Sequence, residues 1–178
     1  MKILLLSDTH GELAGTRKVI FEHRDVDMMI HLGDIGFDIR ELSDFIVVKG
    51  NHDKTWNLPR ERVVEVMGHR ILCMHGDMLE AKTVEEVFAM KTGKDIDIMQ
   101  LCMETLYKNI AQYAKSKNCD VAFFGHSHLR IHVVREGVTL VNPGSLLFGM
   151  DGNDKSYAMV ELQEKDIQVK FYNLEGEL

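Results

Sequence analysis

The sequence has no hydrophobic run long enough to span a bilayer, because polar residues interrupt every apolar stretch. The apolar run that follows Lys2 ends after four residues at Ser7, which is too short for the hydrophobic region of a signal peptide. Cysteine is scarce as well: Cys73, Cys102 and Cys119 are odd in number, and no two of them form a C-x-x-C pair. These absences predict a cytoplasmic chain with reduced thiols and no membrane partner.

Positive charge is in short supply, since 21 Lys and Arg face 28 Asp and Glu and the formal net charge is −7. No cluster of basic residues is interleaved with aromatic ones, which argues against binding to a nucleic-acid backbone and favours a small phosphorylated substrate. With only two prolines, 45% hydrophobic and 28% charged residues, the composition is that of a folded protein. The length of 178 residues predicts one domain over 1–178.

Short apolar runs that end in polar loops dominate the remaining sequence, and they predict an α+β or α/β fold. We expect a helix at Leu13–His23 and strands at Lys2–Leu6, Met28–Leu32, Phe45–Lys49, Arg62–Val66, Arg70–Met74, Val121–Phe124, Ile131–Val134, Val138–Val141, Tyr157–Leu162 and Ile167–Tyr172. Early strand–helix units give way to late hairpins. This order predicts two packed mixed β-sheets flanked by helices.

A change of period predicts helices between the two strand-rich parts of the chain, as an insertion around residues 80–117. The pattern runs from about Thr83 to Ser116, with a break near Thr92-Gly93. One helical face from Met99 to Ala114 is apolar and predicts a core contact, while methionine-rich surfaces also adapt to partners. The segment could therefore also form the contact surface of a homo-oligomer.

Histidine, aspartate and asparagine collect where five predicted strands end. The motifs are Asp8-x-His10, Gly33-Asp34, Gly50-Asn51-His52-Asp53, His75-Gly76 and Gly125-His126-x-His128. Loops at the carboxyl ends of strands converge in space, so these side chains can meet. Imidazole, carboxylate and amide ligands without thiolate suit manganese, nickel, iron, cobalt or zinc, and argue against an all-oxygen magnesium or calcium cage. A carboxylate that bridges two such ions about 3.5–4 Å apart would make a binuclear site.

These five motifs, in this order, resemble those of the calcineurin-like metallophosphoesterase superfamily, and the small size is most similar to its YfcE-like phosphodiesterase branch. The match runs from Lys2 to about Ser145 and includes Asn142-Pro143-Gly144-Ser145. The resemblance implies the four-layer αββα sandwich of that superfamily. It also implies a phosphodiesterase that uses two divalent ions, with manganese as the first choice.

The resemblance assigns a role to each motif residue. By this assignment Asp34 bridges the ions and His52 protonates the leaving oxygen, while hydroxide held by the metals attacks phosphorus in line. The first ion is expected to be held by Asp8, His10 and His128, and the second by Asn51, His75 and His126.

Some positions depart from the family pattern. Phe37 stands where related protein phosphatases have an aspartate that orients the catalytic histidine, so Asp38 or Asp53 is expected to take that role. Asp77 follows His75-Gly76 where many small relatives have a histidine, and its role stays open. Among the other histidines, only His31 lies close enough to Asp34 in sequence for a supporting contact.

Three other functions are alternatives to a phosphodiesterase. A phosphomonoesterase would use the same ligands, and a nuclease is disfavoured by the acidic balance. A protein-interaction scaffold similar to the retromer subunit of this superfamily would show degraded ligands, whereas the ligand set here is complete and His52 is present. Catalysis is therefore the favoured hypothesis.

Overall fold

A computed structural model of the chain describes residues 1–89, 97–150 and 155–178. The described residues form two five-stranded mixed sheets, ordered β10-β9-β1-β2-β3 (the first sheet) and β4-β5-β6-β8-β7 (the second sheet). The strands are β1 Lys2–Leu6, β2 Met28–His31, β3 Phe45–Val47, β4 Glu61–Val66, β5 His69–Met74, β6 Val121–Phe123, β7 Arg130–Arg135, β8 Val138–Pro143, β9 Tyr157–Gln163 and β10 Asp166–Tyr172. Each lies within two residues of its predicted bounds.

The two sheets pack face to face because their central strands are apolar on both faces. In β1, Ile3 and Leu5 point into the space between the sheets, where they pack with Ile71 and Phe123 of the second sheet. The alternate residue Leu4 points outward and packs with Val19 of α1 (Leu13–Glu22). Strand periodicity thus builds an inner core and an outer one at the same time.

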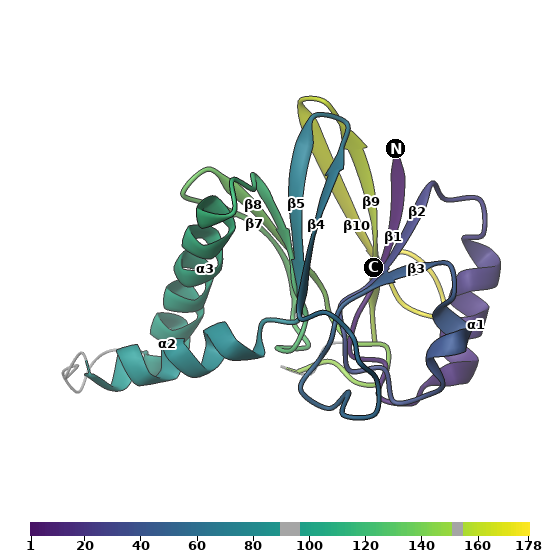
Figure 1. The fold of residues 1–178 in the computed structure, drawn as a ribbon, viewed down its shortest axis with the longest axis horizontal. Helices are drawn as coiled ribbons and strands as arrows, with labels where there is room; N and C mark the ends of the chain where they lie inside the picture. The colour runs from purple at the N-terminus through teal and green to yellow at the C-terminus, as the bar shows by residue number, and fades with distance from the viewer. Residues whose placement is uncertain (90–96, 151–154) are drawn as a thin grey trace.

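On the outer face of the second sheet lies α3 (Ile98–Ser116), whose Ile110 and Ala114 pack on Leu72 and Leu140. Figure 1 shows α1 and α3 on opposite outer sides, with the two sheets between them. The predicted four-layer sandwich of two mixed sheets flanked by helices is therefore confirmed. None of the helices in the described ranges is long and apolar enough to cross a membrane.

The helical segment begins earlier than the sequence pattern predicts, because α2 spans Asp77–Ala89 and starts directly after His75-Gly76. The expected break near Thr92-Gly93 lies outside the described residues. Only part of the predicted apolar face of α3 is core: Leu106 is 8% exposed, whereas Met99 is 73% exposed. Figure 1 shows α2 running outward from the sandwich beneath α3, so the outer part of the helical segment lacks a sheet to pack on.

Parallel pairing brings the motif loops together at one end of the sandwich. In the first sheet β1, β2 and β3 are parallel, and in the second sheet β5, β6 and β8 are parallel. The carboxyl ends of parallel strands meet at one edge, so each sheet delivers its motif loops to a single rim. A short 3₁₀ helix, η1 Ile39–Leu42, follows the second of these loops.

Candidate metal centre

Backbone hydrogen bonds fix the motif loops of the first sheet against each other. Asp8 N donates to Gly33 O at 3.0 Å and His10 N donates to Asp34 O at 2.9 Å. The Asp53 carboxylate then accepts from three backbone N–H groups, those of Asp34 (2.7 Å), Ile35 (2.9 Å) and Gly50 (2.9 Å). These contacts make Asp53 the link between the loops that follow β2 and β3.

Further hydrogen bonds join the first sheet to the second at this rim. Asp8 Oδ2 accepts from His126 N at 2.9 Å, and His75 Nδ1 lies 2.8 Å from Leu32 O, to which it donates. Ser145 Oγ donates to Asp8 O at 2.7 Å. The Asn142–Ser145 turn, which the sequence placed near the motifs, therefore supports the loop that carries Asp8.

Two motif glycines leave room for this convergence. A Cβ on Gly50 would overlap Asp34 Oδ1, and a Cβ on Gly125 would overlap the Ser7 side chain. Any larger residue at either position would push the loops of the two motifs apart.

Several motif residues have left-handed backbone conformations that are costly for residues with a Cβ atom. The φ angles are 52° for Asp8, 41° for His10, 57° for Asp34, 69° for His126 and 55° for His128. The surrounding hydrogen bonds hold these conformations, which aim the side chains at one point.

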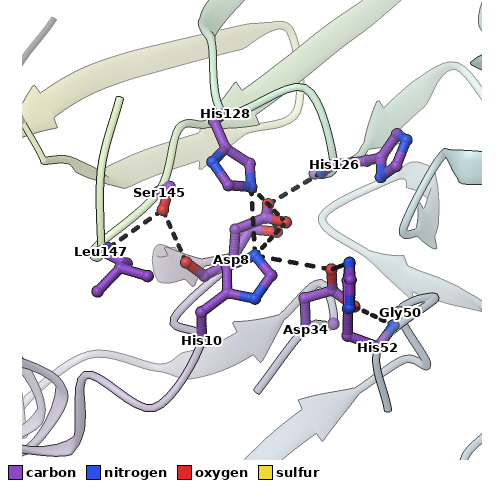
Figure 2. Close-up of polar contacts among 12 residues, drawn as sticks. Asp8, His10, Asp34, Gly50, His52, His126, His128, Ser145 and Leu147 are labelled. Atoms are coloured by element: carbon purple, nitrogen blue, oxygen red, sulfur yellow. Dashed lines mark hydrogen bonds and ion pairs between the residues drawn. The ribbon is translucent and has the colours of Figure 1, made fainter. Parts of the chain in front are cut away.

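Asp8, His10 and His128 form the first ligand group, with one potential ligand atom from each lying within 4.8 Å of the others. Asp8 Oδ1 is 3.3 Å from His128 Nε2 and 3.8 Å from His10 Nε2. Figure 2 shows both imidazoles turned toward the Asp8 carboxylate. The structure thus brings together the three residues that were predicted to hold the first ion.

Asp8, Asp34 and His75 form the second group. His75 Nε2 lies 3.4 Å from Asp34 Oδ2 and 3.0 Å from Asn51 Oδ1. Asp34 Oδ2 is also 3.7 Å from His10 Nε2, so this oxygen faces both groups. That is the position a bridging carboxylate needs. Asp8 belongs to both groups as well, a sharing that the motif assignment did not predict.

The donor set fits divalent cations. Asp8 Oδ1 is buried and makes no hydrogen bond to any residue the structure describes, although three imidazole nitrogens surround it at 3.3 to 3.9 Å. A buried carboxylate oxygen without a donor is destabilising unless a cation compensates it. Mixed nitrogen and oxygen ligands at this spacing suit a transition metal or zinc.

Electrostatic coupling within the cluster is strong. Burial opposes ionisation of Asp34, but the hydrogen bond and charge of His75 and the N–H of His52 outweigh it and hold the pKa near 2. Burial likewise opposes protonation of His75, yet the hydrogen bond to Asp34 and the charges of Asp8 and Asp34 raise its pKa to about 9. Without a cation, the cluster therefore holds a proton on His75.

His126 differs from the predicted arrangement. Its backbone N–H binds Asp8, but its imidazole Nε2 contacts the Glu80 carboxylate of α2, and its ring lies beside that of His75 with centroids 5.0 Å apart. Figure 2 shows the His126 ring directed away from Asp8. Glu80 was missed by sequence reasoning, because only the path of α2 brings it to this loop.

His52 lies at the rim, with 67% of its side chain exposed and Nε2 3.8 Å from Asp34 Oδ2. Neither expected partner orients it: within the described residues, the Asp53 carboxylate binds backbone N–H groups and the Asp38 carboxylate pairs with Arg40. Both interpretations need correction, because the loop path turns Asp53 inward and Asp38 caps η1. What holds His52 is its own N–H, which donates to Asp34 Oδ1 at 2.8 Å.

Other residues acquire roles from the structure. His31 is fully buried: Gly33 N donates to its Nδ1 at 3.1 Å, so its Nε2 donates to Thr9 Oγ1 at 3.0 Å. Burial lowers the pKa of His31 to about 4, and the neutral ring supports the loops after β1 and β2. Asp77 pairs with Arg60 at 3.4 Å, and the Phe148 ring packs on His128 with centroids 4.6 Å apart.

Comparison with known proteins agrees with this geometry. The family model described as the calcineurin-like phosphoesterase superfamily domain matches residues 1–165. The chain is 30% identical over 179 residues to the probable metallophosphoesterase YsnB of Bacillus subtilis, covering 99% of this chain and 93% of YsnB. It is 24% identical over 177 residues to the phosphodiesterase YfcE of Escherichia coli, covering 90% of this chain and 88% of YfcE.

Solved structures share the fold. A predicted phosphoesterase from Streptococcus pneumoniae superposes with a TM-score of 0.79 at 23% identity, covering 99% of this chain and 91% of its own. Vps29 from Chaetomium thermophilum superposes with a TM-score of 0.71 at 17% identity, covering 97% and 90%. The five motifs, the sandwich and the family match lead to one conclusion: this chain belongs to the calcineurin-like phosphoesterase superfamily, a family of metal-using hydrolases that act on phosphate esters and that also includes a scaffold subunit.

Proposed function

We propose that this protein is a phosphodiesterase that works with two divalent cations. The observation that carries the proposal is the convergence of two ligand groups on the carboxylates of Asp8 and Asp34. The name of the relative YfcE, a phosphodiesterase, supports the choice of a diester over a monoester.

In this proposal the ligands are divided between the two cations as the motifs predict. Asp34 Oδ2 faces His10 on one side and His75 on the other, so Asp34 would bridge the cations. Asp8, His10 and His128 would hold the first cation, and Asn51, His75 and His126 would hold the second. For His126 to join, its imidazole must leave Glu80 or bind through its other nitrogen. Manganese is our first choice, followed by nickel, iron, cobalt or zinc.

Two divalent cations held by these residues would polarise the phosphoryl oxygens and lower the pKa of bound water. The protein supplies the remaining requirements. Its fixed loops orient the ester for in-line attack, and His52 stands at the rim with an exposed imidazole that can reach a leaving oxygen. An imidazole titrates near neutral pH, which suits protonation of the departing alcohol.

A non-catalytic scaffold is the alternative, because Vps29 shares the fold. A scaffold would not need an exposed imidazole at the rim, and His52 is present there. The buried ligand groups do not separate the two functions, because a structure of Vps29 from Entamoeba histolytica is a complex with zinc. His52 is therefore the feature that favours catalysis.

One experiment tests the proposal. The protein is stripped with chelator and reloaded separately with manganese, nickel, zinc or magnesium, and hydrolysis of bis-p-nitrophenyl phosphate and p-nitrophenyl phosphate is compared. We expect metal-dependent activity that favours the diester. His52→Ala should lower kcat by about 10²- to 10⁴-fold, the range for loss of a general acid.

His132→Ala is the matched control, because His132 is an exposed histidine of β7 outside the motif loops. This variant should keep wild-type activity. Absence of hydrolysis with every metal would support the scaffold instead. Unchanged activity of His52→Ala would refute the proton-donor role while leaving the metal centre intact.

A further inference from the structure

An open apolar pocket lies between α2 and α3, beside the loop that carries His126 and His128. Its volume is about 350 Å³, within the usual range for small-molecule sites. Val84 of α2, Met99 and Met103 of α3, and Leu129 before β7 contribute apolar side chains to its lining. The motif assignment gives this pocket no role.

The pocket begins at the metal centre. Glu80, which lines it, contacts the His126 imidazole. Ser127, also in the lining, stands between the two motif histidines, and its Oγ accepts from Asn142 Nδ2 at 3.1 Å. The pocket therefore adjoins the loop that carries two of the proposed ligands, so a molecule bound at the cations would lie next to it.

The pocket lining also exposes apolar side chains to water and contains a hydroxyl group without a hydrogen-bond partner among the described residues. Met99 is 73% exposed and Val84 is 41% exposed, so apolar surface faces water next to a polar centre. Tyr107 is 5% exposed, and its buried hydroxyl has no hydrogen-bond partner in the part of the chain that the structure describes. A ligand with an apolar body would remove this surface from water.

We propose that the pocket between α2 and α3 binds an apolar alkyl or aryl ester group of the phosphodiester substrate. This inference rests on the proposed function and names its substrate class. The group concerned is the one that stays on phosphorus. His52, the proposed donor to the leaving oxygen, lies against His10 and Asp34, whereas the pocket begins at His126 and Ser127.

The test keeps the leaving group constant. Methyl, octyl and phenyl p-nitrophenyl phosphates all release p-nitrophenolate, so differences in kcat/KM report the group that remains on phosphorus. We expect the octyl and phenyl esters to exceed the methyl ester by about tenfold or more. Met99→Glu should remove most of that preference and leave the methyl ester within about twofold of wild type.

Ile98→Glu is the matched control, because Ile98 is the 55% exposed neighbour of Met99 on α3 and does not line the pocket. It should retain the preference. Equal kcat/KM for all three esters in active wild-type enzyme would overturn the inference and leave the proposed function standing. Hydrolysis of none of them with any metal would overturn both.

A second measurement does not depend on turnover. Cys102 lines the pocket, whereas Cys73 and Cys119 are buried, so alkylation followed by mass spectrometry reports mainly on Cys102. Octylphosphonate should slow its alkylation about fivefold or more, and methylphosphonate should not. No protection would contradict the inference. A further outcome would also contradict it: sedimentation shows a dimer, and Met99→Glu dissociates that dimer without changing the ester preference. The pocket would then bind a second copy of the chain.

Discussion

Strand β5 carries one histidine at each end of the sandwich, His69 at its start and His75 just past its last residue. Each uses one ring nitrogen to bind a carbonyl oxygen of the other sheet: His69 Nε2 binds Gln163 O at 2.9 Å, and His75 Nδ1 binds Leu32 O at 2.8 Å. The other nitrogens differ. Among the described residues, His69 Nδ1 has a single close partner, Asp120 Oδ2 at 2.5 Å, whereas His75 Nε2 faces Asn51, Asp34 and Asp8 oxygens at 3.0, 3.4 and 3.9 Å.

The difference distinguishes a structural histidine from a metal ligand. At the end with His69, one imidazole and one carboxylate form a pair with each other. At the end with His75, several oxygens and nitrogens surround a common point and do not pair fully. We therefore expect substitutions at the first end to change stability alone and those at the second end to change activity.

Asp34→Asn should give the largest effect. It removes the negative charge that faces both ligand groups, so we expect metal-dependent hydrolysis to fall by about 10³-fold or more. Asp120→Asn, which neutralises the carboxylate at the other end, should stay within about twofold of wild type. Comparable activity of both variants, each with a native circular dichroism spectrum, would remove the distinction between the two ends.

Asp53→Ala should be the next largest change. Its buried carboxylate accepts three backbone N–H bonds, and their loss should lower the free energy of unfolding by about 3 kcal/mol. Urea denaturation measures this quantity. Asp120→Ala removes a half-exposed carboxylate, so we expect a loss of about 1 kcal/mol or less. Equal losses would show that Asp53 does not hold the loops together.

Cation affinity should depend on pH through His75. A ligand imidazole must be neutral, and hydrogen bonding to Asp34 raises the pKa of His75 to about 9, so below that pH the cation displaces a proton. Affinity for manganese should therefore rise by up to about tenfold between pH 7 and pH 8. Calorimetry in buffers of different ionisation enthalpy counts the released proton. His69→Gln should keep the same slope, and a flat profile in wild type would contradict the assignment.

His69→Gln should give the smallest effect. Burial opposes protonation, but the hydrogen bond to Asp120 outweighs it and raises the pKa of His69 above its ordinary value. This stabilisation is fully present below about pH 6.5 and disappears as pH rises through the raised pKa. We expect wild type to be more stable than the variant at pH 6, and the difference to be smaller at pH 9. A difference that grows with pH would reverse the sign of the linkage.

Much of the sandwich could be predicted because its strands are apolar runs that end at polar motifs. Ile3 to Leu6 alternate between two cores, and Asp8 follows at once, so local pattern and site coincide. The same holds for His75 after β5. These parts of the chain are determined by neighbours in sequence.

The rest depends on neighbours in space. Glu80 reaches His126 only because α2 begins at Asp77 and runs past the loop after β6. The direction of the Asp53 side chain follows from how two loops cross, which no local pattern records. Periodicity placed Met99 on the correct face of α3, but it could not predict that the helix extends beyond the sheet that would cover it.

The left-handed backbone at Asp8, His10, Asp34, His126 and His128 has a consequence for how this sequence came to be. A chain under selection for stability alone would favour glycine or asparagine at such positions, because they adopt this conformation at little cost. Aspartate and histidine there oppose folding slightly at every one of the five sites. Their joint presence is what selection for a metal-binding function would produce, and the rest of the sandwich must be stable enough to tolerate it.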